Sequence, residues 1–327
     1  MIGASAVAGG LRLAVTATVP MPRALAALLF ILALLPAASG WAAEVLILQA
    51  ATLEPYAQAR AGVEAGLAEA ARAQAGVSVE PFQVETILVS DQESPVAARE
   101  AVAGRRPALV VAIGSSALAL VKDFSTTPIV YLLVPFPSSI LNSAANATGV
   151  LLDVPLADQL AAAGRALPAV KRVGLVCNPT RSAALLADAR DAAKRLGLEL
   201  RAQLAAEPGD TPHLVDQLAG TVDLFWMLPD PFITTSESVE YLLSASLRYR
   251  IPVLTFSAKF LQTGAALAVL AEPAAMGEQA ARLAARILAG ASPASLPAEP
   301  PAKPRLRINP TVWQRLELLA PDQEKSP

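Results

Sequence analysis

Short apolar runs alternate with amphipathic segments along most of this chain. Runs rich in Val, Ile and Leu are typical of strands buried on both faces of a parallel sheet. The segments between them repeat their apolar residues at helical spacing. In the first half we expect helices over residues 55–74 and 94–103 and strands over residues 44–49, 84–89, 109–113, 128–134 and 147–150. Where a helix joins one strand to the next, we predict parallel pairing with right-handed crossovers.

The same alternation starts again in the second half of the chain. Strands are expected over residues 172–176, 198–203, 224–228, 252–256 and 265–270, and helices over residues 157–166, 182–196, 212–219, 236–248 and 274–288. Two successive series of this kind predict an α/β protein with two doubly wound parallel-sheet lobes. The Pro- and Ala-rich residues 292–304 are expected to be an extended connector without an ordered element, followed by a last helix through Trp313 and Leu316.

The N-terminal segment has the layout of an export signal. Arg23 precedes an uncharged apolar core over residues 25–35, and small residues follow it. We interpret residues 1–42 as a cleaved signal peptide, which predicts a periplasmic location. An uncleaved membrane anchor is the alternative, because an uncharged stretch of about 20 residues can span a bilayer. Of the 26 basic residues only Arg12 and Arg23 lie in this segment, so the rest of the chain keeps an acidic excess. That balance excludes a basic stripe for nucleic acid.

Polar residues follow several of the predicted strands at the point where each strand ends. In open parallel sheets these ends line the ligand site. The candidates are Thr52, Gly114, Ser115, Ser116, Asn178, Thr180, Asp230 and Ser257. Gly114 permits a tight turn before a helix start, where backbone N–H groups favour an anion. Hydroxyl and N–H groups suit a carboxylate, whereas an aspartate suits an ammonium group, so a zwitterion such as an amino acid would satisfy both.

Each candidate also has a structural interpretation. The two serines are equally typical of a helix cap. Residues 178–180 are also typical of a turn, and an aspartate between two prolines is typical of a rigid loop. Aromatic residues near the strand ends belong either to a cleft wall or to the core, namely Tyr56, Phe136, Trp226 and Phe232.

Catalytic chemistry is poorly supported by the sequence. His213 is the only histidine and lies at a predicted helix start, and Cys177 is the only cysteine, at the end of an apolar strand. The chain has no Gly-x-Ser-x-Gly elbow, no phosphate-binding Gly-Lys-Ser/Thr loop and no Cys/His cluster with zinc spacing. We therefore expect no catalytic residue, no metal site and no cofactor.

Several pieces of sequence carry a resemblance to a known family. They are Pro55-Tyr56, Val110-Val-Ala-Ile-Gly-Ser115, Ala147-Thr-Gly-Val150, Lys171-Arg-Val-Gly-Leu-Val-Cys-Asn-Pro-Thr180 and Ile308-Asn-Pro310. Their order and spacing resemble the ABC-transporter substrate-binding proteins of the tryptophan and tyrosine type. The resemblance implies a type I periplasmic-binding fold whose lobes are joined by a three-crossing hinge. It places one lobe over residues 44–152 and 272–303 and the other over residues 153–271 and 304–321. From its terminal position, the tail over residues 322–327 is expected to be disordered.

The resemblance also implies a function and a set of ligand contacts. The family positions fall on Thr52, Ser115, Ser116, Asn178, Thr180, Asp230 and Ser257. The expected function is capture of an amino-acid-like or carboxylate-bearing ligand by a monomeric protein that delivers it to a membrane permease. A ligand-sensing module that signals to a membrane partner is the alternative, and an enzyme on a similar frame is a third class.

One loop departs from the family pattern. After the fourth strand the family usually has a small residue followed by Ser-Asp-Pro, whereas this chain reads Val134-Pro-Phe-Pro-Ser138. The usual acid is lost and Phe136 takes its place. We therefore hypothesise a ligand that is more apolar or less cationic than an ordinary amino acid.

Overall fold

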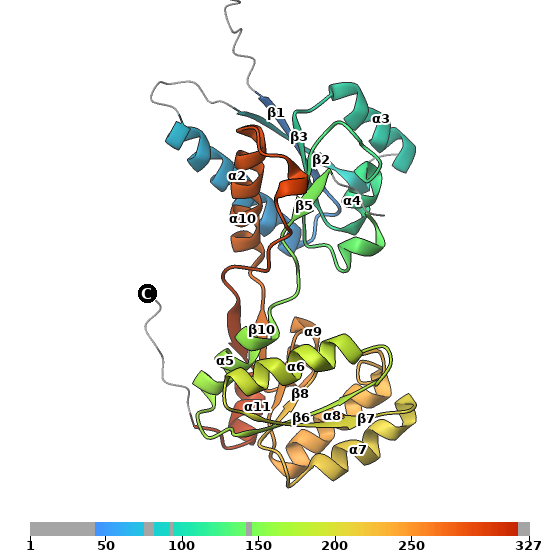
Figure 1. The fold of residues 1–327 in the computed structure, drawn as a ribbon, viewed down its shortest axis with the longest axis vertical. Coiled ribbons are helices and arrows are strands. Elements are labelled where there is room, and N and C mark those ends of the chain that lie inside the picture. The colour runs from blue at the N-terminus through green and yellow to red at the C-terminus, as the bar shows by residue number, and fades with distance from the viewer. Residues whose placement is uncertain (1–42, 75–81, 92–93, 142–145, 320–327) are drawn as a thin grey trace, which may run out of the picture. The chain divides into compact units, whose positions relative to one another are not determined.

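The computed structural model describes residues 43–74, 82–91, 94–141 and 146–319, and these residues form two sheets (Figure 1). The first sheet has the strand order β2-β1-β3-β4-β5, and its strands pair in parallel throughout the described residues. Its strands are β1 (Ala43–Gln49), β2 (Phe82–Leu88), β3 (Leu109–Ile113), β4 (Ile129–Leu132) and β5 (Ala147–Gly149).

Alternate residues of these strands pack against two different layers of helices. Val45 and Ile47 of β1 lie in one cluster with helices α2 (Glu54–Gln74) and α10 (Pro273–Leu288). Leu46 and Leu48 lie in another with helices α3 (Pro95–Arg105) and α4 (Ser115–Val121). Because both faces of the sheet are covered, strands β3 and β4 are buried at every position, as expected for a parallel sheet.

Helices α2 and α10 approach each other closely through glycines. A Cβ atom on Gly62 would lie 2.1 Å from the carbonyl oxygen of Ala274, and one on Gly277 would lie 2.1 Å from that of Ala59. No side chain fits at either position, so the two helices depend on glycine at their contact. This contact fixes α10, which lies late in the sequence, to the first sheet.

The second sheet has the order β11-β10-β9-β8-β6-β7, and only β11 is antiparallel to its neighbour. Its strands are β6 (Arg172–Cys177), β7 (Glu199–Leu204), β8 (Leu224–Trp226), β9 (Val253–Thr255), β10 (Leu267–Leu270) and β11 (Arg305–Ile308). The accompanying helices are α5 (Leu156–Ala166), α6 (Ala183–Arg195), α7 (Thr211–Leu218), α8 (Ser236–Tyr249), α9 (Ala258–Thr263) and α11 (Pro310–Arg315).

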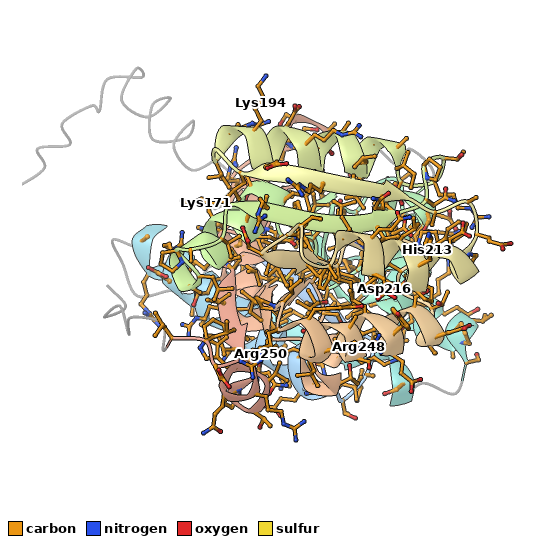
Figure 2. All side chains as sticks on the ribbon, turned by 90° about the horizontal axis from the view of Figure 1, so that it is seen from below. Lys171, Lys194, His213, Asp216, Arg248 and Arg250 are labelled. Carbon is orange, nitrogen blue, oxygen red and sulfur yellow. The ribbon has the colours of Figure 1, made fainter. Side chains whose placement is uncertain are left out.

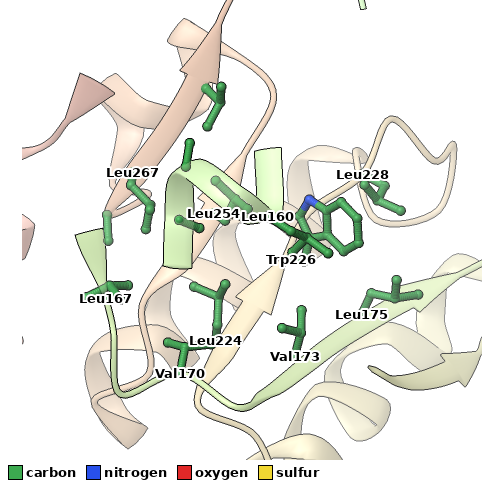
Figure 3. Packing of buried hydrophobic residues seen from close by; sticks show 14 of the residues in the cluster. Leu160, Leu167, Val170, Val173, Leu175, Leu224, Trp226, Leu228, Leu254 and Leu267 are labelled. Carbon is green, nitrogen blue, oxygen red and sulfur yellow. The ribbon is translucent and has the colours of Figure 1, made fainter. Parts of the chain in front are cut away.

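The core under α5 contains a buried polar contact. Leu160, Trp226, Leu254 and Leu267 pack together there (Figure 3). The indole N–H of Trp226 donates to Oε1 of Gln159 at 3.1 Å, and Nε2 of Gln159 donates to the carbonyl oxygen of Val154 at 2.9 Å. Trp226 is therefore a core residue, and its one polar atom is satisfied inside that core.

Both sheets confirm the predicted α/β class, with successive strands joined by helices on both faces. The chain passes from the first sheet to the second after β5, returns into α10 after β10, and passes over again before β11. The predicted signal peptide and the predicted tail over residues 322–327 lie outside the described residues.

The segment from residue 292 to residue 304 is more ordered than its composition suggests, and the prediction of a connector without an ordered element was wrong. It contains a short 3₁₀ helix (Pro293–Ser295), and Glu299 pairs with Val150 beside β5. The buried amide of Gln279 on α10 donates to the carbonyl oxygen of Pro300 at 3.0 Å and accepts from the N–H of Ala302 at 3.0 Å. These long-range contacts hold the segment, and local composition carries no signal of them. The helix α9 was likewise not predicted.

Candidate functional site

At the first sheet, the loops after β1, β3 and β4 are tied together by backbone hydrogen bonds. Ala50 donates to the carbonyl oxygen of Ile113 at 2.9 Å, and Gly114 donates to that of Leu132 at 3.0 Å. Gly114 has φ 95°, and a Cβ there would lie 2.8 Å from Cβ of Ala50 and 3.2 Å from Cε1 of Tyr56. The tight turn predicted at Gly114 is present, and the ring of Tyr56 packs directly beside it.

Ser115 and Ser116 stand at the start of α4 but do not cap it. Gly114 occupies the N-cap position and no side chain supplies a capping hydrogen bond. Among the described residues neither hydroxyl has a hydrogen-bond partner, and Ser116 is exposed while Ser115 is partly so. Thr52, in the loop after β1, is exposed as well. The capping explanation therefore does not apply to the two serines, whose hydroxyls are free to meet a ligand.

The loop after β4 has an unusual backbone. The strand ends at Leu132, two residues earlier than predicted, because Leu133 adopts φ 53° and leaves the extended conformation. Phe136, between two prolines, has φ 48°, and its carbonyl oxygen accepts from both the N–H and the hydroxyl of Ser139. The side chain of Phe136 is 67% exposed. A rigid loop thus presents an aromatic ring to solvent near the carboxyl end of a central strand.

At the second sheet, Asp230 connects the loops after β6 and β8. Its Oδ2 accepts from the N–H of Asn178 at 2.7 Å and from the hydroxyl of Ser182. Its Oδ1 accepts from the N–H of Phe232 at 2.7 Å and of Ile233 at 3.3 Å. The residue has no exposed surface. Both carboxylate oxygens are therefore engaged by donors of the chain itself.

The neighbouring candidates divide into buried and exposed groups. Oδ1 of Asn178 accepts from the N–H groups of Thr180 and Arg181 at 3.0 and 2.6 Å, so this side chain forms the turn itself. Thr180 is exposed, and Ser257 precedes α9 without a side-chain capping bond. Phe232 is half-buried beside the cluster under α8. Sequence reasoning missed Ser182, whose position four residues after Asn178 gave no sign of its contact with Asp230.

Cys177 is buried at the end of β6, as predicted. Burial raises the pKa of its thiol to about 11, the negative charge of Asp230 adds to that rise, and Arg190 opposes it. A thiol of this kind stays protonated near neutral pH and is a poor nucleophile.

His213 is exposed on α7 (Figure 2). Its Nε2 lies 2.8 Å from Nε2 of Gln217. On the same helix Asp216 accepts hydrogen bonds from the hydroxyls of Tyr241 and Tyr249 at 2.7 and 3.0 Å. The guanidinium of Arg248 lies over both rings, with its carbon 5.8 and 5.7 Å from their centroids. These contacts connect α7 to α8, and nothing in them resembles a catalytic arrangement.

The described part of the chain offers neither a metal site nor a membrane-spanning helix. No group of three or more His, Cys, Asp or Glu residues there could hold a metal ion. Within the same residues, no helix combines the length and the apolar character needed to cross a bilayer.

The two sheets, with polar groups following their strands, define an α/β protein of the periplasmic-binding type. A family model described as ABC transporter substrate binding protein matches residues 45–324. The chain belongs to this family of substrate-binding proteins, whose members are normally exported and are not enzymes. This match confirms the resemblance found in the sequence. No curated protein sequence matches the chain.

Solved structures show the same fold. The ligand-free, open structure of CD0873, a substrate-binding protein with adhesive properties from Clostridium difficile, has a TM-score of 0.65 at 16% identity, covering 86% of this chain and 97% of that one. A XylFII–LytSN complex gives a TM-score of 0.57 at 10% identity, with coverage of 83% and 99%. An ABC domain in complex with L-Trp from Streptococcus pneumonia gives a TM-score of 0.50 at 19% identity, covering 86% of this chain and 96% of that one. At these identities the likeness concerns the fold alone.

Proposed function

We propose that this chain is the periplasmic solute-binding component of an ABC importer. It captures a small amino-acid-like or carboxylate-bearing ligand between two lobes, one over residues 44–152 and 272–303 and the other over residues 153–271 and 304–321. A cleaved signal peptide over residues 1–42 exports it. The protein works as a monomer and needs neither cofactor nor metal. The family match over residues 45–324 is the main support for this proposal.

The exposed and partly exposed hydroxyls at the strand ends support a ligand site at these edges. The side chains of Thr52, Ser115 and Ser116 belong to the first lobe, and those of Thr180 and Ser257 to the second. Hydroxyl groups without internal partners are suited to hold carboxylate oxygens. The aromatic rings of Tyr56, Phe136 and Phe232 supply the apolar wall that small-molecule sites require.

Closure around the ligand provides the mechanism. A ligand that touches both lobes binds the closed form more tightly than the open form and shifts the population towards it. A membrane permease then recognises the closed form and receives the ligand. Hinge bending is possible because only three chain segments connect the two sheets.

Mass spectrometry of the small molecules that co-purify with the protein identifies the ligand. Calorimetry then compares the wild-type chain with Ser115→Ala. Loss of a buried hydroxyl partner is expected to weaken binding by about 1–3 kcal/mol, or about 5- to 150-fold. Ser244→Ala, an exposed position on α8, is the matched control and should bind like the wild type. If Ser115→Ala bound the ligand as tightly as Ser244→Ala, Ser115 would not be a ligand contact.

A sensory module is the second candidate. The XylFII–LytSN complex unites a protein of this fold with a partner, and the same arrangement would let this chain report its ligand instead of delivering it. Genes for a permease and an ATPase beside this gene would favour import. A neighbouring sensor-kinase gene would favour signalling.

A further inference from the structure

Asp230 is the acidic residue that follows the central strand β8, and its carboxylate is fully used inside the protein. Four donors of the chain, three backbone N–H groups and the hydroxyl of Ser182, occupy its two oxygens. With no exposed surface, the carboxylate cannot reach an ammonium group unless the loop opens and these bonds break. Since each unpaired N–H group would remain buried, that exchange is unfavourable.

The other loops after the central strands contain few acidic residues that could pair with an ammonium group in place of Asp230. Residues 133–141, after β4, contain no acid. After β1, the first acid is Glu54 at the start of α2, and its Oε1 already accepts from Nε2 of Gln58 at 2.9 Å. After β5, Asp153 is exposed, and desolvation raises the pKa of its carboxyl above the ordinary value. The loop after β4 therefore offers no carboxylate to a protonated amine, and the loop after β8 offers none that is free.

Exposed cations are found at the corresponding edge of the second sheet. Arg181 follows Thr180 in the loop after β6, and Lys259 lies two residues after Ser257. Both side chains are exposed, and neither makes an ion pair with any residue that the structure describes. These two side chains offer positive charge to a ligand at this edge.

Exposed apolar side chains flank the turn at Gly114. Leu53 follows β1 and is 62% exposed, while Phe136 follows β4 and is 67% exposed. Strand β3, which leads into Gly114, lies between β1 and β4 in the sheet. Large apolar side chains that are exposed to solvent beyond the carboxyl ends of strands indicate a contact surface for an apolar group.

From these observations we infer that the ligand is an organic anion with an apolar or aromatic body and no protonated amine, such as an aryl- or alkyl-carboxylate. This inference rests on the proposed function and narrows it. The hydroxyls at the strand ends and the cations Arg181 and Lys259 bind the carboxylate, while Leu53 and Phe136 contact the apolar body. An α-amino group beside Phe136 and these cations would receive no counter-charge from Asp230 or from the loop after β4, which is unfavourable.

Calorimetry with matched ligand pairs tests the inference. The pairs are phenylalanine with 3-phenylpropanoate, tryptophan with indole-3-propionate and leucine with 4-methylpentanoate, so that each differs only by the amine. In any pair that binds, the acid without the amine is expected to bind at least about tenfold more tightly. An amino acid that binds as tightly as its partner would overturn the inference and leave the proposed function standing. If neither these compounds nor any member of a metabolite library bound, the proposed function would fail together with the inference.

Two variants of one loop residue provide an internal control. Phe136→Asp returns a carboxylate to the loop after β4, and Phe136→Asn changes the side chain to a similar size without the charge. The preference for the acid over the amino acid should shrink several-fold more in the aspartate variant than in the asparagine variant. Equal changes in the two variants would show that charge at this loop does not set specificity, contrary to the inference. Circular dichroism of both variants checks that each remains folded.

Discussion

The backbone N–H of Asn178 donates to Oδ2 of Asp230 at 2.7 Å, which joins the loops that follow two neighbouring strands, β6 and β8. The contact spans 52 positions in the sequence. Asn178 in turn holds the N–H groups of Thr180 and Arg181. One buried carboxylate therefore fixes the backbone that carries several exposed candidates for ligand contact.

Replacing Asp230 should destabilise the protein as a whole. In Asp230→Asn the new NH₂ group faces N–H donors, and the loss of charge weakens the remaining bonds, so we expect a loss of about 2–4 kcal/mol in unfolding free energy. Ser182→Ala removes one donor only and should cost about half as much or less. Urea unfolding followed by circular dichroism measures both. A wild-type midpoint for Asp230→Asn would mean that the buried carboxylate does not hold these loops.

The class of the fold could be predicted from the sequence because the central strands are apolar on both faces and the intervening helices are amphipathic. The role of Asp230 could not. A Pro-Asp-Pro segment looks the same whether the carboxylate faces a ligand or the backbone of another loop, and only the three-dimensional position of Asn178 and Ser182 decides between them. The same reason explains residues 292–304, whose order comes from Gln279 on a distant helix. Local signals predict elements well, whereas long-range hydrogen bonds leave no trace in a single sequence.

A methyl group at the contact between α2 and α10 should be strongly unfavourable. In Gly277→Ala the new Cβ would lie 2.1 Å from the carbonyl oxygen of Ala59, so the helices must move apart. We expect the free energy of unfolding to fall by about 3 kcal/mol or more, at the upper end of the cost of overpacking. Gly164→Ala in α5 is the control, because no atom lies within 4 Å of its new Cβ. In this control, the higher helix propensity of alanine should raise the free energy of unfolding by about 0.5–1 kcal/mol. Similar thermal midpoints for the two variants would contradict the close contact.

The thiol of Cys177 should be unreactive in the folded protein. It is 1% exposed, and its pKa is raised to about 11, mainly by burial. At pH 8 less than about one thiol in a hundred would be ionised, and a reagent would also lack access. Labelling with a chromogenic disulfide should be slow in buffer and complete in urea, where the thiol recovers its ordinary pKa. Rapid labelling without denaturant would show that the loop after β6 opens readily.

The ion pair of Asp223 and Arg172 should contribute stability at neutral pH that is lost in acid. The guanidinium of Arg172 donates to Oδ1 of Asp223 at 2.5 Å, and the N–H groups of Lys171 and Arg172 donate to Oδ2 at 3.0 and 2.8 Å. The hydrogen bond from Arg172 is the largest cause that lowers the pKa of Asp223 to about 2, while partial burial opposes it. Because the folded pKa lies below the ordinary value of 3.8, this contribution is complete above about pH 4 and disappears between about pH 4 and pH 2.

Asp223→Asn measures that contribution. At pH 7 the variant should lose about 1–2 kcal/mol of unfolding free energy, reduced from the full linkage value because solvent screens the partly exposed pair. The difference from the wild type should shrink as urea unfolding is repeated at pH 4 and pH 3. Asp123→Asn removes the carboxylate of an exposed pair with Arg99 and serves as the control, with an expected change within about 0.5 kcal/mol. A loss in Asp223→Asn that stays constant from pH 7 to pH 3 would show that the ionised carboxylate is not the source of the stability.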